Sequence, residues 1–442
     1  MADHGLNTTG ASSRPSAGRI GLFAAMSIGI GGMIGAGIFS ILGVVAQASG
    51  TAMWISFLIG GVVAMLSTYS YAKLGAKYPS AGGAVEFLVK GFGDGVLSGG
   101  INMYMWVGYV IALALYAQAF AGYAMTFFPP HSATWAAKAI GTGIVVLFTL
   151  VNVIGASFVG RSETLIVVVK LAILLLFAVA GLLFIHPTYL APNLWPPATG
   201  ILFGAGVLFI GYEGFGLVAN AAEDMDDPQR MLPKALYLSV IAVIVIYVAV
   251  SLAVIWNLDV PSILKAKDYA LAQAAKPFLG DFGFRLVAVG ALFSTASAIN
   301  ATLFGAANVS YMIARDGELP RAFSWSIRPN ASGGLFITAG TVILFVLFFD
   351  LSSVAMMGSG AFLLIYASVH AAHLQVANET GGNKWIVWLA LATCLVMAAI
   401  LSVYIYQHAR PAFFTMLGLI PVCLAAEWAY RAATGRTIAT RN

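Results

Sequence analysis

The stretch "GIGGMIGAGIF", from Gly29 to Phe39, decides how this chain folds. It lies inside an apolar run from about residue 20 to residue 48 and carries five glycines in 11 residues. Each glycine inside a helix costs about 1 kcal/mol relative to alanine. The stretch therefore predicts an apolar helix that is interrupted near its middle.

The composition places this helix in a membrane. Of the 442 residues, 60% are hydrophobic and only 9% are charged, whereas a soluble domain carries about 25% charged residues. Apolar runs of about 20 residues, the length that crosses a bilayer as a helix, recur along the chain. The strands of a transmembrane β-barrel would be shorter, and apolar and polar residues would alternate along them. We count twelve spans: 20–48, 52–76, 96–127, 135–157, 163–185, 200–222, 232–256, 285–313, 334–349, 353–375, 385–407 and 411–431.

The charges predict the orientation. With twelve spans, both termini lie on one side, and that side holds most of the 22 Lys and Arg residues. The positive-inside rule then places both termini in the cytoplasm of a cell (inner) membrane protein. Residues 1–19 read as a cytoplasmic tail rather than a cleaved signal peptide. The net charge of +5 reflects such positive loops rather than binding of nucleic acid.

The two cysteines, Cys394 and Cys423, fall in late spans, where they are interpreted as packing residues. No metal site or cofactor is therefore expected.

A second interruption matches the first. Span six reads "FGAGVLFIGYEGFGLVANAAE" (203–223), and "GYEGFG" (211–216) breaks it. The two broken spans are five spans apart, so a repeated five-helix unit would enter the membrane from the opposite face. We expect a first repeat over 20–185, a second over 200–375, two additional helices over 385–431 and a cytoplasmic tail over 432–442.

Broken helices expose backbone groups that bind ligands. An amino acid could satisfy them, because its carboxylate accepts from N–H groups at a half-helix N-terminus and its ammonium donates to carbonyls. The alternative is close helix packing, since Gly31 and Gly35 have the GxxxG spacing of membrane helix contacts. A dinucleotide site is excluded, because the glycines miss the GxGxxG spacing and no strand precedes them.

Two ionisable residues lie deep in spans, where such groups are costly and usually functional. Lys170, in span five, could snorkel to the interface, hold carbonyls of the first span as a fixed cation, or gain and lose a proton during transport. Glu213, in the break of span six, could bind a cationic part of the substrate, sense protonation or only accept local N–H groups. Glu163 and Glu427 lie nearer span ends, where solvation at the interface is the simpler interpretation. His370 and His373 lie near the cytoplasmic end of span ten, and a functional role is not expected for them.

Span eight offers a further candidate site. Ser294, Thr295 and Ser297 could line a cation site or the pocket against the first span. Hydroxyls in membrane helices also bond back to their own backbone, which is the competing interpretation.

Three motifs together resemble those of the amino acid–polyamine–organocation transporter superfamily. They are "IGGMIGAGIF" (30–39), "FIGYEGFGLVANAAEDMDDPQRMLPKAL" (209–236) and "YMIARDGELPRAF" (311–323). The resemblance implies an all-α fold with two inverted five-helix halves and discontinuous helices 1 and 6 (the LeuT-like fold), plus two extra helices. It also implies alternating access and an amino acid or amine substrate.

The resemblance also implies roles for individual residues. Backbone at Gly35, Ala36 and Gly37 would take the substrate carboxylate, and Tyr212 would wall the pocket. Lys170 falls where proton-coupled relatives carry a lysine, and Glu213 where some relatives carry an acidic residue linked to gating. Carbonyls near the following residues would take the ammonium: Ile34, Phe209, Ile210 and Gly211.

We therefore expect a secondary transporter for amino acids, working as a proton-coupled symporter. The alternative is an amino acid/polyamine exchanger or amine carrier in which Glu213 binds a substrate ammonium. An enzyme is not expected, because no paired carboxylates, Ser–His arrangement or metal-ligand cluster is visible in the spans. The sequence leaves the substrate, the coupling stoichiometry and the oligomeric state open.

Overall fold

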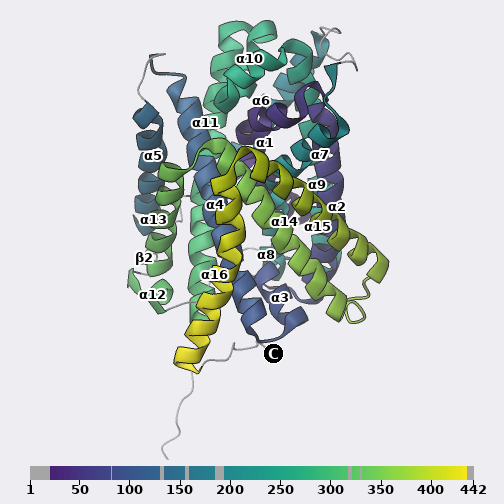
Figure 1. Ribbon diagram of the computed structural model, residues 1–442, viewed down its shortest axis with the longest axis vertical. Helices are drawn as coiled ribbons and strands as arrows, with labels where there is room; N and C mark the ends of the chain where they lie inside the picture. The colour runs from purple at the N-terminus through teal and green to yellow at the C-terminus, as the bar shows by residue number, and fades with distance from the viewer. Residues whose placement is uncertain are drawn as a thin grey trace, which may run out of the picture.

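The computed structural model describes residues 20–80, 82–129, 134–154, 159–184, 194–316, 321–328 and 331–435. These residues are almost entirely helical, apart from the short antiparallel strands β1 (Ser326–Arg328) and β2 (Ala331–Ser332) (Figure 1). The helices are α1 Leu22–Ser49, α2 Met53–Lys77, α3 Ala84–Phe92, α4 Val96–Met125, α5 Thr134–Ile154, α6 Val159–Leu183, α7 Ala198–Val207, α8 Gly216–Asn220, α9 Pro228–Asn257, α10 Val260–Lys265, α11 Ala270–Asp316, α12 Arg321–Ser324, α13 Gly333–Phe348, α14 Leu351–Val376, α15 Lys384–His408 and α16 Arg410–Thr434.

Within the described part of the chain, ten helical segments are long and apolar enough to cross a membrane. Two shorter apolar stretches, Leu22–Gly35 and Gly333–Phe348, accompany them. Every range expected to span the membrane overlaps a helix. The chain is therefore a helical integral membrane protein. The expected tail over 1–19 lies outside the described residues, as do residues 436–442 of the tail expected over 432–442. The start of that tail is helical instead, because α16 continues to Thr434.

The break expected in the first span is absent, and this part of the prediction is wrong. Helix α1 runs without interruption from Leu22 to Ser49. The glycines are explained by contact instead, because several of them approach neighbouring helices more closely than a side chain would permit. The alternative of close helix packing therefore describes α1 in this structure.

The break expected in the sixth span is present. Helix α7 ends at Val207, a 3₁₀ segment follows over Leu208–Phe215 (η5), and α8 starts at Gly216. The 3₁₀ segment starts three residues before the expected interruption, and all eight of its residues are buried. The broken span thus lies in the interior of the helical bundle.

The helices form an inner and an outer set. Helices α4 and α14 are buried along most of their length, whereas α5, α6 and α16 leave most of their residues at the surface of the bundle. Helix α10 caps one end of the molecule, and α3, α8, α12 and the C-terminal end of α16 lie at the other (Figure 1). The core contains α1, η5 and the helices that pack on them, including α9 and α14.

Candidate functional site

The two glycine-rich segments meet at the centre of the bundle. A β-carbon on Gly214 of η5 would lie 2.2 Å from the carbonyl carbon of Gly32 and 2.3 Å from the amide nitrogen of Met33 in α1. A β-carbon on Gly32 would lie 3.0 Å from the carbonyl oxygen of Gly214. The contact is between backbones, so neither position has room for a side chain. Both segments are predicted from their glycine content, and the structure brings them together.

Tyr247 of α9 links α1 to the broken span. Its hydroxyl oxygen lies 2.5 Å from the carbonyl oxygen of Met33 and 3.0 Å from that of Gly211. Gly37 leaves the space for this hydroxyl, because a β-carbon there would lie 2.3 Å from it. The ring is fully buried. Tyr247 was not predicted as a site residue, and it satisfies one of the carbonyls expected to bind an ammonium group.

Helix α14 supports the break in the sixth span. The hydroxyl of Ser359 donates to the carbonyl of Val207 (2.5 Å) and accepts from the amide of Ile210 (3.0 Å). The hydroxyl of Tyr366 donates to the backbone carbonyl of Glu213 (2.8 Å). Buried backbone groups that leave a helix need such partners in a membrane. These two side chains supply them on either side of the interruption.

Lys170 reaches the glycine-rich stretch of α1 from α6. Only 3% of the residue is exposed, and its Nζ donates to the carbonyl of Gly31 at 2.8 Å. A β-carbon on Gly35 would lie 3.9 Å from the same nitrogen. Lys170 therefore contacts the predicted site directly and does not snorkel to the surface.

Ser294 of α11 contacts the same stretch. Its hydroxyl is hydrogen-bonded to the carbonyls of Ile34, at 3.2 Å, and Gly35. The structure thus brings Lys170 and Ser294 to carbonyls of α1 that lie one helical turn apart. The expected ammonium acceptors at Ile34 and Gly211 both have side-chain donors in this structure.

The remaining predicted residues lie around this centre with different partners. Thr295 is buried and donates to the Ala291 carbonyl of its own helix (2.7 Å), which matches the competing interpretation. Ser297 is half-buried. Tyr212 is fully buried and donates to the Phe57 carbonyl of α2 (2.8 Å), so here it is anchored in the core. Ala36 lies within α1, and its side chain is outside the described part.

Glu213 is a buried acid among aromatic rings. The residue is 5% exposed, and among the described residues no side chain or backbone group forms a hydrogen bond or ion pair with its carboxylate. Tyr71, Phe215 and Tyr366 pack against one another, with ring centroids 5.1–5.4 Å apart. The carboxylate is within electrostatic range of four tyrosines: Tyr71, Tyr109, Tyr116 and Tyr366. An uncompensated acid inside an aromatic wall is an arrangement that attracts a cation.

A Ser–His network joins α2 to α14 and was not foreseen. The imidazole of His370 is hydrogen-bonded to Ser70 (2.8 Å) and Ser67 (3.2 Å). His373 is hydrogen-bonded to Ser70 (2.9 Å) and Thr380 (2.9 Å). Both histidines are completely buried. In the sequence, the signal is a matching i, i+3 spacing of Ser67 and Ser70 in one span and of His370 and His373 in the other.

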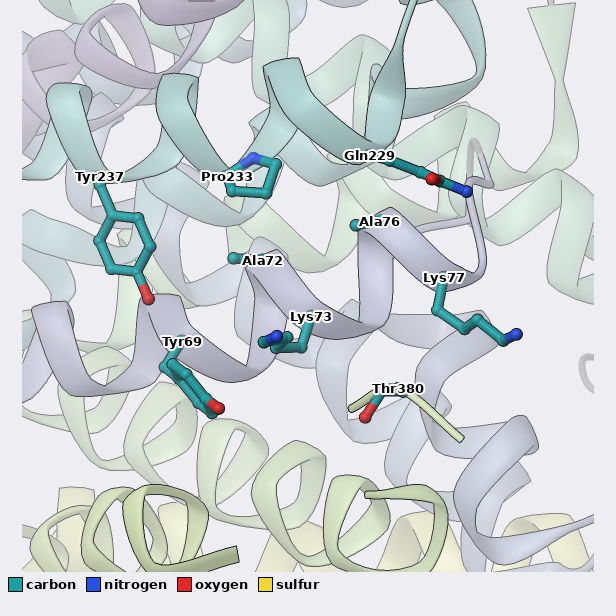
Figure 2. Close-up of a pocket in the computed structure, with 9 residues that line it drawn as sticks. All are labelled: Tyr69, Ala72, Lys73, Ala76, Lys77, Gln229, Pro233, Tyr237 and Thr380. Carbon is teal, nitrogen blue, oxygen red and sulfur yellow. The ribbon is translucent and has the colours of Figure 1, made fainter. Parts of the chain in front are cut away.

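Two cavities lie at opposite ends of the bundle, away from the predicted site. One, of about 360 Å³, lies between the C-terminal end of α2 and the N-terminal end of α9 (Figure 2). The other, of about 270 Å³, is lined by residues near the end of α4 and the start of α14, including Asp268 and Asp350. In the described part of the chain, no group of three or more His, Cys, Asp or Glu residues is placed to hold a metal ion.

A bundle of apolar helices around a broken span, with a buried lysine and a buried glutamate, is the architecture of a membrane transporter. The sequence profile of the amino acid permease family matches residues 20–424. The chain belongs to this family, within the amino acid–polyamine–organocation superfamily. The resemblance noted in the sequence is thereby confirmed.

Individual relatives agree with this assignment. The chain is 40% identical to an uncharacterized protein of Methanocaldococcus jannaschii over 95% of this chain and 97% of that protein. It is 34% identical to the inner membrane transport protein YbaT of Escherichia coli, over 88% of this chain and 90% of that protein. It is 28% identical to the serine/threonine exchanger SteT of Bacillus subtilis, over 69% of each chain. The family and its named members are transporters, so the chain is a membrane transporter for small molecules.

Proposed function

We propose that this chain is a secondary active transporter that carries amino acids by proton-coupled symport and alternating access. The proposal includes twelve spans, with inverted repeats over 20–185 and 200–375, two additional helices over 385–431 and cytoplasmic tails at 1–19 and 432–442. The protein would lie in the cell (inner) membrane. Membership of the amino acid permease family supports the substrate class.

The observation that carries the proposal is the contact between α1 and the broken sixth span. In the proposed cycle, the substrate ammonium binds carbonyls at Ile34, Phe209, Ile210 and Gly211, and the carboxylate binds amides at Gly35, Ala36 and Gly37. Each carbonyl oxygen accepts two hydrogen bonds. The Ile34 carbonyl accepts from Ser294 and lies inside the continuous helix α1. In this cycle α1 therefore opens over residues 34–37, and the hydroxyls of Tyr247 and Ser294 move away from Gly211 and Ile34 as the substrate binds.

Lys170 is the proposed coupling residue. Its ammonium group holds the Gly31 carbonyl of α1 from α6, so loss of its proton weakens the link between these two helices. A charged hydrogen bond contributes more than a neutral one. Protonation would thus favour one arrangement of α1 and α6 over the other, and this couples a proton to the conformational change.

The test is uptake into proteoliposomes. Under an inward proton gradient and with labelled amino acids, the proposal expects accumulation above the equilibrium level, and collapse of the gradient should abolish it. Uptake that is unaffected by the gradient but needs an amino acid on the opposite side would contradict symport and establish exchange. No uptake of any amino acid, with uptake of amines, would reject the substrate class.

A second candidate function is an amino acid/polyamine exchanger or amine carrier. The observation that favours it is the buried Glu213 carboxylate, which lacks a partner among the described residues and lies within range of four tyrosines. A second substrate ammonium would compensate this charge. The relative named as a serine/threonine exchanger shows that exchange occurs among similar proteins. Diamine uptake that depends on Glu213 would establish this function.

A further inference from the structure

The cavity between α2 and α9 has a basic lining. Figure 2 shows Lys73 and Lys77 on α2 across from Gln229, Pro233 and Tyr237 on α9. The cavity measures about 360 Å³, and no Asp or Glu is among the residues that line it. The complete lining is Tyr69, Ala72, Lys73, Ala76, Lys77, Gln229, Pro233, Tyr237 and Thr380. The cavity therefore concentrates positive charge.

The two lysines have no acidic partner among the described residues, and nearby acids have other partners. Glu379 accepts a hydrogen bond from the hydroxyl of Tyr78 at 2.6 Å. Asp227 caps α9 and lies 3.7 Å from Arg230. Lys73 is also half-buried, which makes an unpaired ammonium costly. A bound anion would remove this cost.

The cavity lies where two helices long and apolar enough to cross a membrane reach the end of the bundle, which corresponds to the level of lipid headgroups. Lys77 is the last residue of α2, and Gln229 is the second residue of α9, so both helices end at the cavity. Tyrosines and lysines concentrate at this level in membrane proteins, where their polar ends reach the interface. Tyr69 and Tyr237 flank the lysines in the same way.

We propose that this cavity is a binding site for a phosphate-bearing anion, supplied by the headgroup of an anionic phospholipid. Lys73 and Lys77 hold the phosphate oxygens, and the amide of Gln229 is placed to donate from the N-terminal end of α9. The site requires only that the protein is in a membrane. It does not depend on which substrate is transported. Because its walls come from α2 and α9, a lipid bound there joins the two helices.

The experiment measures thermal stability of the detergent-purified, delipidated protein. We would titrate a short-chain phosphatidylglycerol, the matching phosphatidylcholine and inorganic phosphate against the wild type and a Lys73→Gln/Lys77→Gln variant. A ligand that binds the folded state raises the melting temperature with its concentration. Lys234→Gln is the matched control, because Lys234 lies exposed on α9 close to the cavity but does not line it.

The proposal expects phosphatidylglycerol, and not phosphatidylcholine, to stabilise the wild type and the Lys234→Gln control. In the double variant the concentration for half-maximal effect should rise at least tenfold. Equal effects of both lipids, or an unchanged response of the double variant, would overturn the proposal. If inorganic phosphate stabilises the protein and competes with phosphatidylglycerol, the cavity is a phosphate site. Its ligand is then a soluble phosphate compound and not a lipid, which would overturn the lipid part of the proposal.

A second measurement protects against a double variant that does not fold. Native mass spectrometry of the wild-type protein counts retained lipids directly. The proposal expects one phosphatidylglycerol that survives washing while phosphatidylcholine is removed. Loss of both lipids at the same rate would overturn it without any variant.

Discussion

The hydroxyl of Tyr247 occupies the space that a side chain on Gly37 would need. The β-carbon of an alanine at residue 37 would lie 2.3 Å from that oxygen and 2.9 Å from the carbonyl oxygen of Gly211. The tyrosine joins α1 to the broken span through the carbonyls of Met33 and Gly211. The absence of a side chain at Gly37 is thus what permits this link.

Gly37→Ala should therefore destabilise the protein and stop transport, because either α1 or Tyr247 must move. Overpacking of a buried site typically costs about 1–3 kcal/mol, so we expect a clear fall in melting temperature. Gly340→Ala in α13 is the control, since a β-carbon there meets nothing within 4 Å. If the two alanine variants melted and transported alike, the close approach would be of no importance.

Ser359→Ala should destabilise the break of the sixth span. The change leaves the buried Val207 carbonyl and Ile210 amide without their partner, and each unsatisfied group costs about 1–3 kcal/mol. Ser368→Ala is the control on the same helix, because Ser368 only bonds back to the Leu364 carbonyl. Melting curves and uptake rates of the two variants would be compared. Equal melting temperatures would show that Ser359 is dispensable.

Lys170→Ala should abolish accumulation driven by the proton gradient. The variant loses the charged donor to Gly31, and with it the group proposed to bind the proton. Counterflow of substrate without a gradient separates coupling from folding, and it should persist in the variant. Full gradient-driven accumulation by Lys170→Ala would remove this residue from the coupling mechanism.

Glu213→Gln should change which substrates are carried. The glutamine amide has nearly the same shape as the carboxylate but no charge. If the Glu213 carboxylate binds a substrate cation, the variant loses affinity for diamines and basic amino acids. Uptake of neutral amino acids should be kept, with an altered dependence on pH. Glu379→Gln is the control, because Glu379 binds Tyr78 outside the spans. An identical substrate and pH profile would make Glu213 a structural residue.

The sequence predicted the two glycine-rich segments and the buried charges for clear physical reasons. Glycines and ionisable residues are costly in an apolar helix, so Gly32, Lys170 and Glu213 stand out without a structure. The sequence could not decide whether α1 would be broken. Glycines weaken a helix, but they also permit close contact between helices. In α1 the close contact is what the structure shows, because the backbone of Gly214 packs against Gly32.

The partners of the backbone were beyond sequence reasoning. Tyr247, Ser359 and Tyr366 come from helices that are apolar on all sides, so no polar face indicates which way a residue points. The Ser–His network offered slightly more. Ser67 and Ser70 match the spacing of His370 and His373, but only the packing of α2 on α14 shows that the pairs meet.

The hydroxyls of Tyr247 and Ser294 have a consequence for the kinetics of a transport cycle. They hold the carbonyls of Gly211 and Ile34 from within the protein, so these polar groups do not need a substrate to be satisfied. A carrier whose empty binding site is internally satisfied can reorient without cargo at little electrostatic cost. That return of the empty carrier is the step that a symporter must complete in every turnover, and the step that an obligate exchanger has to prevent.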